Sequence, residues 1–189
     1  MATAGPNAPG TAADDSAVGT AAWSNPDRVK VLGVSATSFG VIAGATVTSH
    51  YMKVTNFGFA IPSGATINGV QTLIRRKSSR NSGTEWGVDS VVKLVKGGAV
   101  SGSNYASATH YPTAQTDAIY GGTSDLWGLS LTDSDVNDST FGFVLSATVV
   151  GTAGNDSPVD YMTMTITYTE SAGGLSIPVA MQSYRQRRV

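Results

Sequence analysis

The stretch that decides the fold runs from Val159 to Thr169 and reads VDYMTMTITYT. Through its middle, every second residue is large and apolar, and the residues between them are mostly threonine. Side chains of a β-strand point alternately to the two faces of a sheet, so this period of two predicts a long strand with one face in the core. The predicted inward set is Met162, Met164, Ile166 and Tyr168, and the outward set is Tyr161, Thr163, Thr165 and Thr167.

Further strands are predicted on the N-terminal side of this one. The segment TFGFVLSATVV has the same period and places Phe141, Phe143, Leu145, Ala147 and Val149 on one face. Shorter strands are predicted at 28–32, 51–59, 67–76 and 89–96. The stretch 99–123 is long for a loop and should contain one or two short strands, and Thr132 should cap a helical turn. This series predicts an all-β fold, an antiparallel β-sandwich of jelly-roll-like type.

The composition indicates one domain with an extended arm at each end. The chain has 189 residues, of which 41% are hydrophobic and only 13% are charged, and it contains no cysteine. Residues 1–20 are rich in Ala, Gly, Pro and Thr, and we expect them to form a flexible leader. The sandwich is then predicted over residues 21–170, followed by an arm over residues 171–189.

Charge and hydropathy exclude several kinds of partner. The net charge of −1 provides no positive field for nucleic acid. No apolar run reaches the length of a transmembrane helix, and the N-terminus has neither the basic nor the apolar region of a secretory signal. We therefore expect a protein that folds or assembles inside the cell that makes it, without a membrane as partner.

Catalytic and metal-binding patterns are weak throughout the sequence. His50 and His110 belong to no ligand-spaced motif, and no GxSxG segment occurs. Glutamate occurs only at Glu85 and Glu170, which disfavours a pair of catalytic carboxylates. The segment DSDVND lacks the glycine and the final glutamate of a calcium loop, so its carboxylates are interpreted as helix caps. We expect no enzyme, no metal and no cofactor.

Two local features are candidates for contact with a glycan or a protein partner. Trp86 lies in a polar segment, where an exposed indole could stack on a sugar, whereas Trp127 is flanked by leucines and is expected in the core. Arg75 and Arg76 begin a basic cluster, RRKSSR, at the end of a predicted strand. A cluster this short usually forms a solvated strand end, and the alternative is a surface that contacts a partner.

The C-terminal arm is interpreted as a docking device. Ordering a chain costs about 1–2 kcal/mol per residue, and burial of each large apolar side chain on a neighbour returns about 1.5–3 kcal/mol. The arginines could then pair with carboxylates of that neighbour. An extra edge strand on the chain's own sandwich is the alternative. The predicted docking residues are Leu175, Ile177, Pro178, Met181, Tyr184, Arg185, Arg187 and Arg188.

Five blocks of the sequence, in this order, resemble a β-sandwich module of tailed-bacteriophage virion proteins. They are AAWSNPDRV, YMKVTNFGFAIPSGATINGVQTLIRRK, DSVVKLVKGG, TSDLWGLSLTDSDVNDSTFGFVLSA and VDYMTMTITYT. Modules of this kind resemble parts of head decoration proteins, head fibres, neck appendages and tail accessories. The resemblance covers the chain from about Trp23 to Thr169 and carries over no catalytic residue.

The resemblance implies a structural, non-enzymatic component of a virion that is assembled in the bacterial host cytoplasm. Its expected partners are other virion proteins of the capsid, neck or tail, with further copies of itself in a homo-oligomer. The arm would attach it to the particle. The alternative function is a glycan-binding adhesion module that recognises the host surface.

Overall fold

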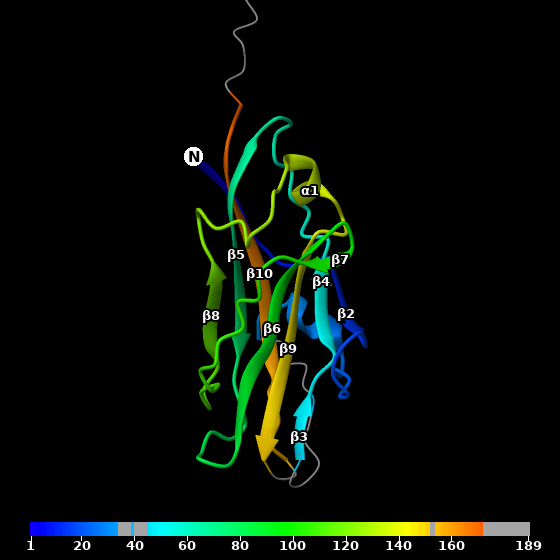
Figure 1. Ribbon diagram of the computed structural model, residues 1–189, viewed down its shortest axis with the longest axis vertical. Coiled ribbons are helices and arrows are strands. Elements are labelled where there is room, and N and C mark those ends of the chain that lie inside the picture. The colour runs from blue at the N-terminus through cyan, green and yellow to red at the C-terminus, as the bar shows by residue number, and fades with distance from the viewer. Residues whose placement is uncertain (34–38, 40–44, 152–153, 172–189) are drawn as a thin grey trace, which may run out of the picture.

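Two antiparallel sheets pack face to face in an elongated sandwich (Figure 1). The computed structural model describes residues 1–33, 39, 45–151 and 154–171. The four-stranded sheet has the order β1 (Ala2–Asn7), β10 (Val159–Thr169), β5 (Thr66–Arg76) and β8 (Thr116–Gly121). The six-stranded sheet has the order β2 (Thr11–Asp15), β4 (Tyr51–Thr55), β9 (Gly142–Gly151), β6 (Trp86–Lys96) and β7 (Ala99–Ser101), with β3 (Ala45–Thr48) also on β9. The predicted all-β, jelly-roll-like sandwich is confirmed.

The stretch that decides the fold becomes β10, at the centre of the four-stranded sheet. It pairs with β1 on one side and with β5 on the other, and Met164 lies opposite Thr72 of β5. Met162, Met164 and Ile166 are fully buried, as their alternation predicts, and Tyr168 packs at the edge of the core.

The facing wall of the core is β9, at the centre of the other sheet between β4 and β6. The side chains that the sequence places on one face, from Phe141 to Val149 in steps of two, are all buried. Trp127 is also fully buried, and its Nε1 donates a hydrogen bond of 2.9 Å to the Val70 carbonyl oxygen. The prediction that Trp127 belongs to the core is confirmed.

The prediction of a flexible leader over residues 1–20 is wrong. Residues 2–7 pair with β10 as β1, and residues 11–15 pair with β4 as β2. Ala4 and Ala12 pack against the core from the edges of the two sheets. Small side chains suffice at these edge positions because backbone hydrogen bonds to the neighbouring strand hold the segment in place. The sandwich therefore begins almost at the first residue rather than at residue 21.

Of three further local predictions, one is wrong and two are confirmed. The strand predicted at 28–32 is instead a 3₁₀ helix, η1 (Pro26–Lys30), because Pro26 in the first turn favours a helical start. The stretch 99–123 contains the short strands β7 and β8, as expected. Thr132 caps α1 (Asp133–Asn137) in a reciprocal pair with Asp135, which confirms the helix-cap interpretation of this acidic segment.

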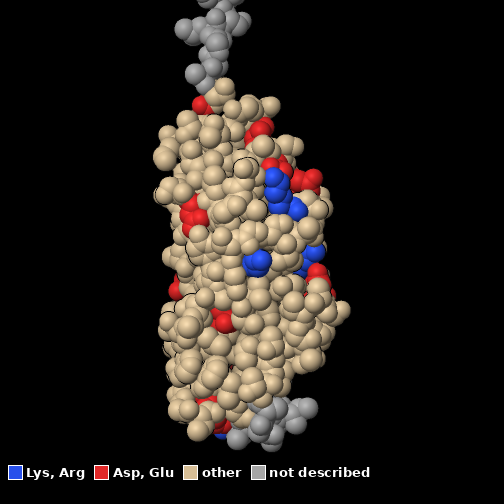
Figure 2. Space-filling model, in the orientation of Figure 1, with Lys and Arg blue, Asp and Glu red and all other residues tan. Residues whose placement is uncertain are grey.

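The surface agrees with the low content of charged residues. On the face drawn in Figure 2, most of the surface is uncharged, and acidic and basic side chains lie next to each other along its right side. Within the described ranges, none of the helices has the length and apolar character needed to cross a bilayer.

Two substitutions in β2 distinguish a strand from a flexible leader. Ala12 points toward the core opposite Val54, whereas Ala13 is exposed opposite Lys53. We expect Ala12→Asp to lower the free energy of unfolding by about 1–3 kcal/mol, because it places a carboxylate against apolar side chains. We expect Ala13→Asp to change it by no more than about 0.5 kcal/mol. Urea denaturation measures both values, and two unchanged variants would show that this segment contributes nothing to the fold.

Candidate functional site

A buried ion pair joins the two sheets near one end of the sandwich. Arg76, the last residue of β5, donates from Nε to Oδ1 of Asp89 at 3.2 Å and from Nη2 to Oδ2 at 3.0 Å. The exposed fraction is 7% for the Arg76 side chain and 0% for that of Asp89. Buried charges of this kind are tolerated only when they are paired and fully hydrogen-bonded.

Local strand geometry turns both side chains inward. Arg76 follows the inward series Val70, Thr72 and Ile74, which alternates along β5. Asp89 lies opposite Ala147 of β9, and a register shift between Asp89 and Val91 marks a β-bulge in β6. The bulge places Asp89 on the same inner face as Val92, although the two residues are three positions apart.

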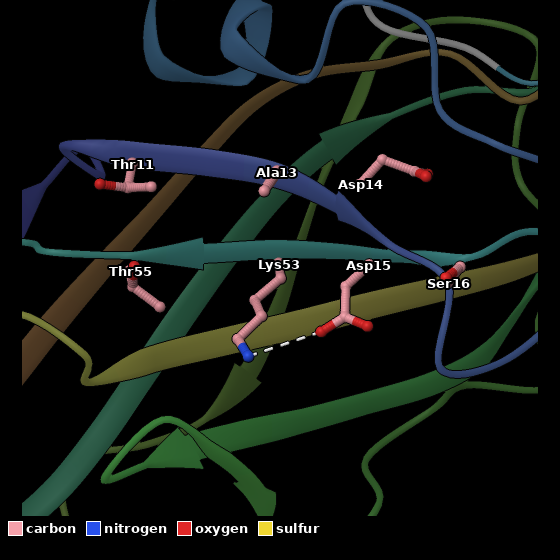
Figure 3. A pocket seen from close by; sticks show the side chains of 7 residues that line it. All are labelled: Thr11, Ala13, Asp14, Asp15, Ser16, Lys53 and Thr55. Atoms are coloured by element: carbon pink, nitrogen blue, oxygen red, sulfur yellow. Dashed lines mark hydrogen bonds and ion pairs between the residues drawn. The ribbon is translucent and has the colours of Figure 1, made fainter.

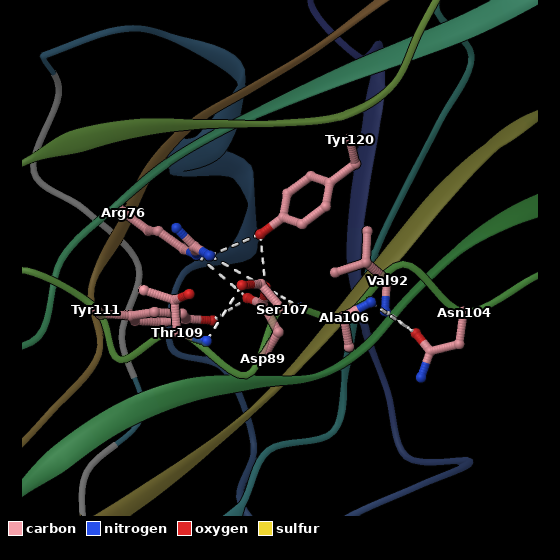
Figure 4. Close-up of polar contacts among 9 residues, drawn as sticks. All are labelled: Arg76, Asp89, Val92, Asn104, Ala106, Ser107, Thr109, Tyr111 and Tyr120. Carbon is pink, nitrogen blue, oxygen red and sulfur yellow. Dashed lines mark hydrogen bonds and ion pairs between the residues drawn. The ribbon is translucent and has the colours of Figure 1, made fainter. Parts of the chain in front are cut away.

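Two tyrosines and a backbone amide complete the shell of the carboxylate (Figure 4). The hydroxyl of Tyr111 donates to Oδ1 of Asp89, and the hydroxyl of Tyr120 donates to Oδ2, both at 2.6 Å. The Ser107 amide donates to Oδ2 at 3.0 Å, and Nη2 of Arg76 also donates to the Tyr120 oxygen at 2.7 Å. The guanidinium carbon lies 4.0 Å from the centroid of the Tyr111 ring. The four side chains therefore form one connected polar cluster between the sheets.

The environment fixes the protonation states of this cluster. Burial and the neighbouring charge of Asp89 raise the pKa of Tyr111 and the pKa of Tyr120 well above the usual tyrosine value. Burial alone would lower the pKa of Arg76, but Tyr111, Asp89 and Tyr120 raise it on balance. At neutral pH the arginine is charged and both tyrosines keep the protons that they donate to Asp89.

A cleft of about 310 Å³ opens beside the cluster, along the free edge of β8. Its lining combines hydroxyl groups, two nitrogen-rich side chains and a small apolar area, and includes no carboxylate. The lining residues are Arg76, Ser107, Thr109, His110, Pro112, Thr116, Ala118, Ile119 and Tyr120. Asp89 lies behind this wall, so the positive end of the buried ion pair is the end that meets the cleft.

Arg76 has spare hydrogen-bonding capacity at the cleft. Its Nε and Nη2 atoms are bound to Asp89 and Tyr120, but Nη1 has no hydrogen-bond partner among the described residues. In Figure 4 the dashed lines from the guanidinium run only to Asp89 and Tyr120. A ligand in the cleft can therefore accept hydrogen bonds from an arginine that the protein already holds in position.

A pair of stacked rings stands next to the cleft. The rings of Trp86 and His110 lie 4.3 Å apart between centroids and within 9° of parallel. Trp86 begins β6 and is half-buried, so the prediction of an exposed indole in a polar loop is wrong in part: His110 covers one face of the ring. The exposed ring of the pair is that of His110, which also lines the cleft.

Arg75 and Arg76 do not form the single basic surface that the sequence suggests. Adjacent residues of a strand point to opposite faces, and Arg75 lies on the outer face, where Nη1 donates to Oδ1 of Asp117 at 2.9 Å. Arg76 is 6% exposed, so the prediction of a solvated basic cluster fails for this residue. The predicted docking residues of the arm, Leu175 to Arg188, lie outside the described residues.

A second groove lies on the outer face of the six-stranded sheet, between β2 and β4 (Figure 3). Its volume is about 500 Å³, and Nζ of Lys53 and Oδ2 of Asp15 lie 3.5 Å apart within it. It is open and has no aromatic side chain in its lining, which comprises Thr11, Ala13, Asp14, Asp15, Ser16, Lys53 and Thr55. It offers a ligand less enclosure and no ring on which to stack, so the cleft at β8 is the stronger candidate site.

Metal binding finds no support in the described part of the chain, where no group of three or more His, Asp or Glu side chains is close enough to hold an ion. His50, for example, forms a single pair with Asp14, with 2.8 Å between Nδ1 and Oδ2. Asp14 also accepts a hydrogen bond from the Trp23 amide at 2.7 Å, which indicates that this pair anchors the segment after β2.

Comparison with known proteins finds only weak structural similarity to solved β-sandwich structures. No family model matches the chain, and no curated protein matches its sequence. Among solved structures, TmCBM61 in complex with β-1,4-galactotriose has a TM-score of 0.38 at 11% identity, over 82% of this chain and 86% of that one. BiXyn10A CBM1 has a TM-score of 0.36 at 11% identity, over 87% of this chain and 100% of that one. A CBM4 structure has a TM-score of 0.33 at 12% identity, over 68% of this chain and 82% of that one.

These three structures are carbohydrate-binding modules. Their ligands belong to those modules and are not assigned to this chain by the comparison. At such low scores the likeness extends to a shared β-sandwich and no further. None of the three is described as a virion protein.

Most residues of the site escape prediction from the sequence. Asp89 lies in β6, Tyr120 in β8 and Tyr111 on the connection between β7 and β8, and these segments carry no recognisable motif. His110 belongs to no ligand-spaced motif either. One signal was present: the alternation of Val70, Thr72 and Ile74 continues to Arg76 and places a charge inside the sandwich. An inward arginine requires a buried acidic partner, which would have directed attention to the aspartates of neighbouring strands.

Neighbouring arginines on β5 provide a matched test of the buried pair. Asp89→Asn leaves the Arg76 charge buried without its partner, and we expect it to lower the free energy of unfolding by about 3–5 kcal/mol. Asp117→Asn removes one of the two carboxylates that pair with Arg75 at the surface and leaves Asp160, and we expect a loss of no more than about 1 kcal/mol. Thermal and urea denaturation measure both, and equal losses for the two variants would contradict a special role for the buried pair.

The raised pKa values of Tyr111 and Tyr120 predict a loss of stability at alkaline pH. The folded protein keeps these two protons at pH values where the unfolded chain, with a tyrosine pKa near 10.0, releases them. The contribution to stability is therefore complete below about pH 10 and is lost as the pH rises toward the folded-state pKa values. Tyrosinate absorbance, followed together with circular dichroism, should show a late ionisation step that coincides with unfolding. Complete ionisation of all tyrosines in still-folded protein would be inconsistent with this account.

Proposed function

We propose that the protein is a non-catalytic binding module and that the cleft along β8 holds a carbohydrate. The observation that carries this proposal is the lining of the cleft, which places hydroxyls, an arginine nitrogen and an imidazole ring beside a small apolar wall. Its volume of about 310 Å³ is at the lower end of the usual range for small-ligand sites.

A sugar ring matches this lining because it has two kinds of surface. Its hydroxyl groups both donate and accept hydrogen bonds, which suits Thr109, Thr116 and the free Nη1 of Arg76. Its C–H faces are apolar and pack on flat side chains, which suits the ring of His110 and the side chain of Ile119. Ile119 is 59% exposed although it is large and apolar, so a ligand that covers it removes apolar surface from water.

The same lining supports binding rather than hydrolysis. Hydrolysis of a glycosidic bond usually requires two carboxyl groups on opposite sides of that bond, and the cleft lining contains none. Asp89, the nearest buried carboxylate, accepts hydrogen bonds from Arg76, both tyrosines and the Ser107 amide. These bonds fill its acceptor positions and hold it behind the wall of the cleft.

Attachment to a phage particle through the C-terminal arm stays a prediction from the sequence resemblance, as does assembly into a homo-oligomer. A glycan-binding module on a virion would combine both functions. The cleft and its test do not depend on where the protein is displayed.

A glycan array followed by calorimetry tests the proposed function. We expect the protein to bind at least one class of saccharide with a Kd below about 1 mM. The double variant His110→Ala/Ile119→Ala should weaken that binding by about tenfold or more, because it removes both packing surfaces of the cleft. Both residues are exposed, but His110 stacks on Trp86, so we expect the variant to stay folded with a loss of stability of at most about 1.5 kcal/mol.

The groove between β2 and β4 provides the control. Thr11→Ala/Thr55→Ala removes two hydroxyls from that groove and should leave saccharide affinity unchanged. Absence of saccharide binding on the array, or loss of binding only in the groove variant, would overturn the assignment of the cleft.

A further inference from the structure

We infer that the cleft prefers sugars that carry a carboxylate, such as hexuronates, over neutral sugars. This inference rests on the proposed function and assigns the chemical class of its ligand. It follows from three features of the described residues: the free nitrogen of Arg76, the rigid support of its guanidinium, and the absence of acidic groups from the lining of the cleft.

The guanidinium of Arg76 is held in place from two directions. Asp89 binds its Nε and Nη2 atoms, and the ring of Tyr111 packs against its flat face at 4.0 Å. The third nitrogen, Nη1, has no hydrogen-bond partner among the described residues, on a side chain that is more than nine-tenths buried. A guanidinium fixed in this way loses little conformational entropy when it binds a ligand, and a planar carboxylate is the acceptor that matches its geometry best.

The charges around the cleft favour an anionic ligand group. The buried ion pair is oriented with Arg76 at the wall and Asp89 behind it, so a ligand approaches the positive end first. The carboxylate of Asp89 is further screened by the hydroxyl groups that Tyr111 and Tyr120 donate to it. Asp117, on β8, points to the outer face of the sheet and is paired there with Arg75.

The remaining lining completes a site for a charged sugar rather than for a bare anion. Thr109 and Thr116 offer hydroxyls to the sugar ring, and Ile119 and Pro112 offer apolar contact. An inorganic anion can accept hydrogen bonds from Arg76 and from the hydroxyls, but it leaves the apolar residues of the lining without a contact. A hexuronate uses both parts of the lining, with its carboxylate on Nη1 of Arg76 and its ring against the uncharged residues of the lining.

Calorimetry with a matched pair of ligands tests this preference. Oligogalacturonate and its methyl ester have the same sugar skeleton, and only the free acid carries negative charge. At low salt and neutral pH we expect the free acid to bind at least about tenfold more tightly than the ester. Glucuronate oligomers, neutral galactose oligomers, and sulfate or phosphate alone serve as further ligands.

A pair of substitutions at Thr116 tests the position of the ligand charge. Thr116 is exposed and lines the cleft, and among the described residues its hydroxyl bonds only to the nearby Ala114 carbonyl oxygen, so both substitutions should leave the fold intact. Thr116→Glu places a negative charge in the cleft, and Thr116→Gln has the same shape without the charge. We expect the Glu variant to bind the free acid about tenfold more weakly than the Gln variant, with equal binding of the ester.

A conservative change of the arginine itself adds a second readout. Arg76→Lys keeps a positive charge but has no Nη1, whereas Arg75→Lys makes the same change on the opposite face of the sheet. We expect only Arg76→Lys to remove the preference for the acid over the ester. If Arg76→Lys does not fold, the two Thr116 variants still test whether the cleft prefers a carboxylate.

The possible outcomes separate this inference from the function on which it rests. Tight binding of neutral sugars, with no gain for the acid form, overturns the preference for carboxylates and leaves the binding module in place. Binding of sulfate or phosphate as tight as that of hexuronates also overturns it, because the sugar ring then contributes nothing. Absence of binding to every saccharide overturns both.

Discussion

The structure around the cleft depends on one buried ion pair. Arg76 and Asp89 come from different sheets, and their contact fixes how far apart β5 and β6 lie at this end of the sandwich. The carboxylate also holds the Ser107 amide and the Tyr111 hydroxyl, which anchors the connection that follows β7. Backbone hydrogen bonds from the Tyr111 amide to the Gly87 carbonyl oxygen and from the Ser78 amide to that of Pro112 hold the same connection beside the ion pair.

Apolar packing and the ion pair have different tasks in this sandwich. The inner faces of β9 and β10 supply a continuous core of valine, leucine, phenylalanine and methionine, and burial of this surface drives folding. A buried ion pair adds little net stability, since both charges must leave water. Its contribution is geometric: it keeps a charged group in a fixed position at the border of the core.

The sequence predicts the centre of the sandwich better than its edges or its cleft. Alternation identifies β9 and β10 because their inner faces need large apolar side chains over many residues. β1 and β2 are not predicted from the sequence, because edge positions accept alanine and threonine, which also occur in flexible tails. The inward position of Arg76 follows from the alternation of β5, but that of Asp89 depends on a bulge whose register no pattern reveals. His110 lies on a connection, where its stacking on Trp86 depends on the complete fold.

The pairing of β1 with β10 separates the ends of the described chain from the cleft. Ala2 lies opposite Tyr168, and Tyr168 lies opposite Ile67 near the start of β5. Arg76 and Thr116 pair at the far end of the same strand. A tether joined beside Ala2 or Thr169 would therefore leave from one pole while the mouth of the cleft stays toward the other (Figure 1). Whatever carries this domain, a solid support or a larger particle, could hold it upright with its binding end pointing outward.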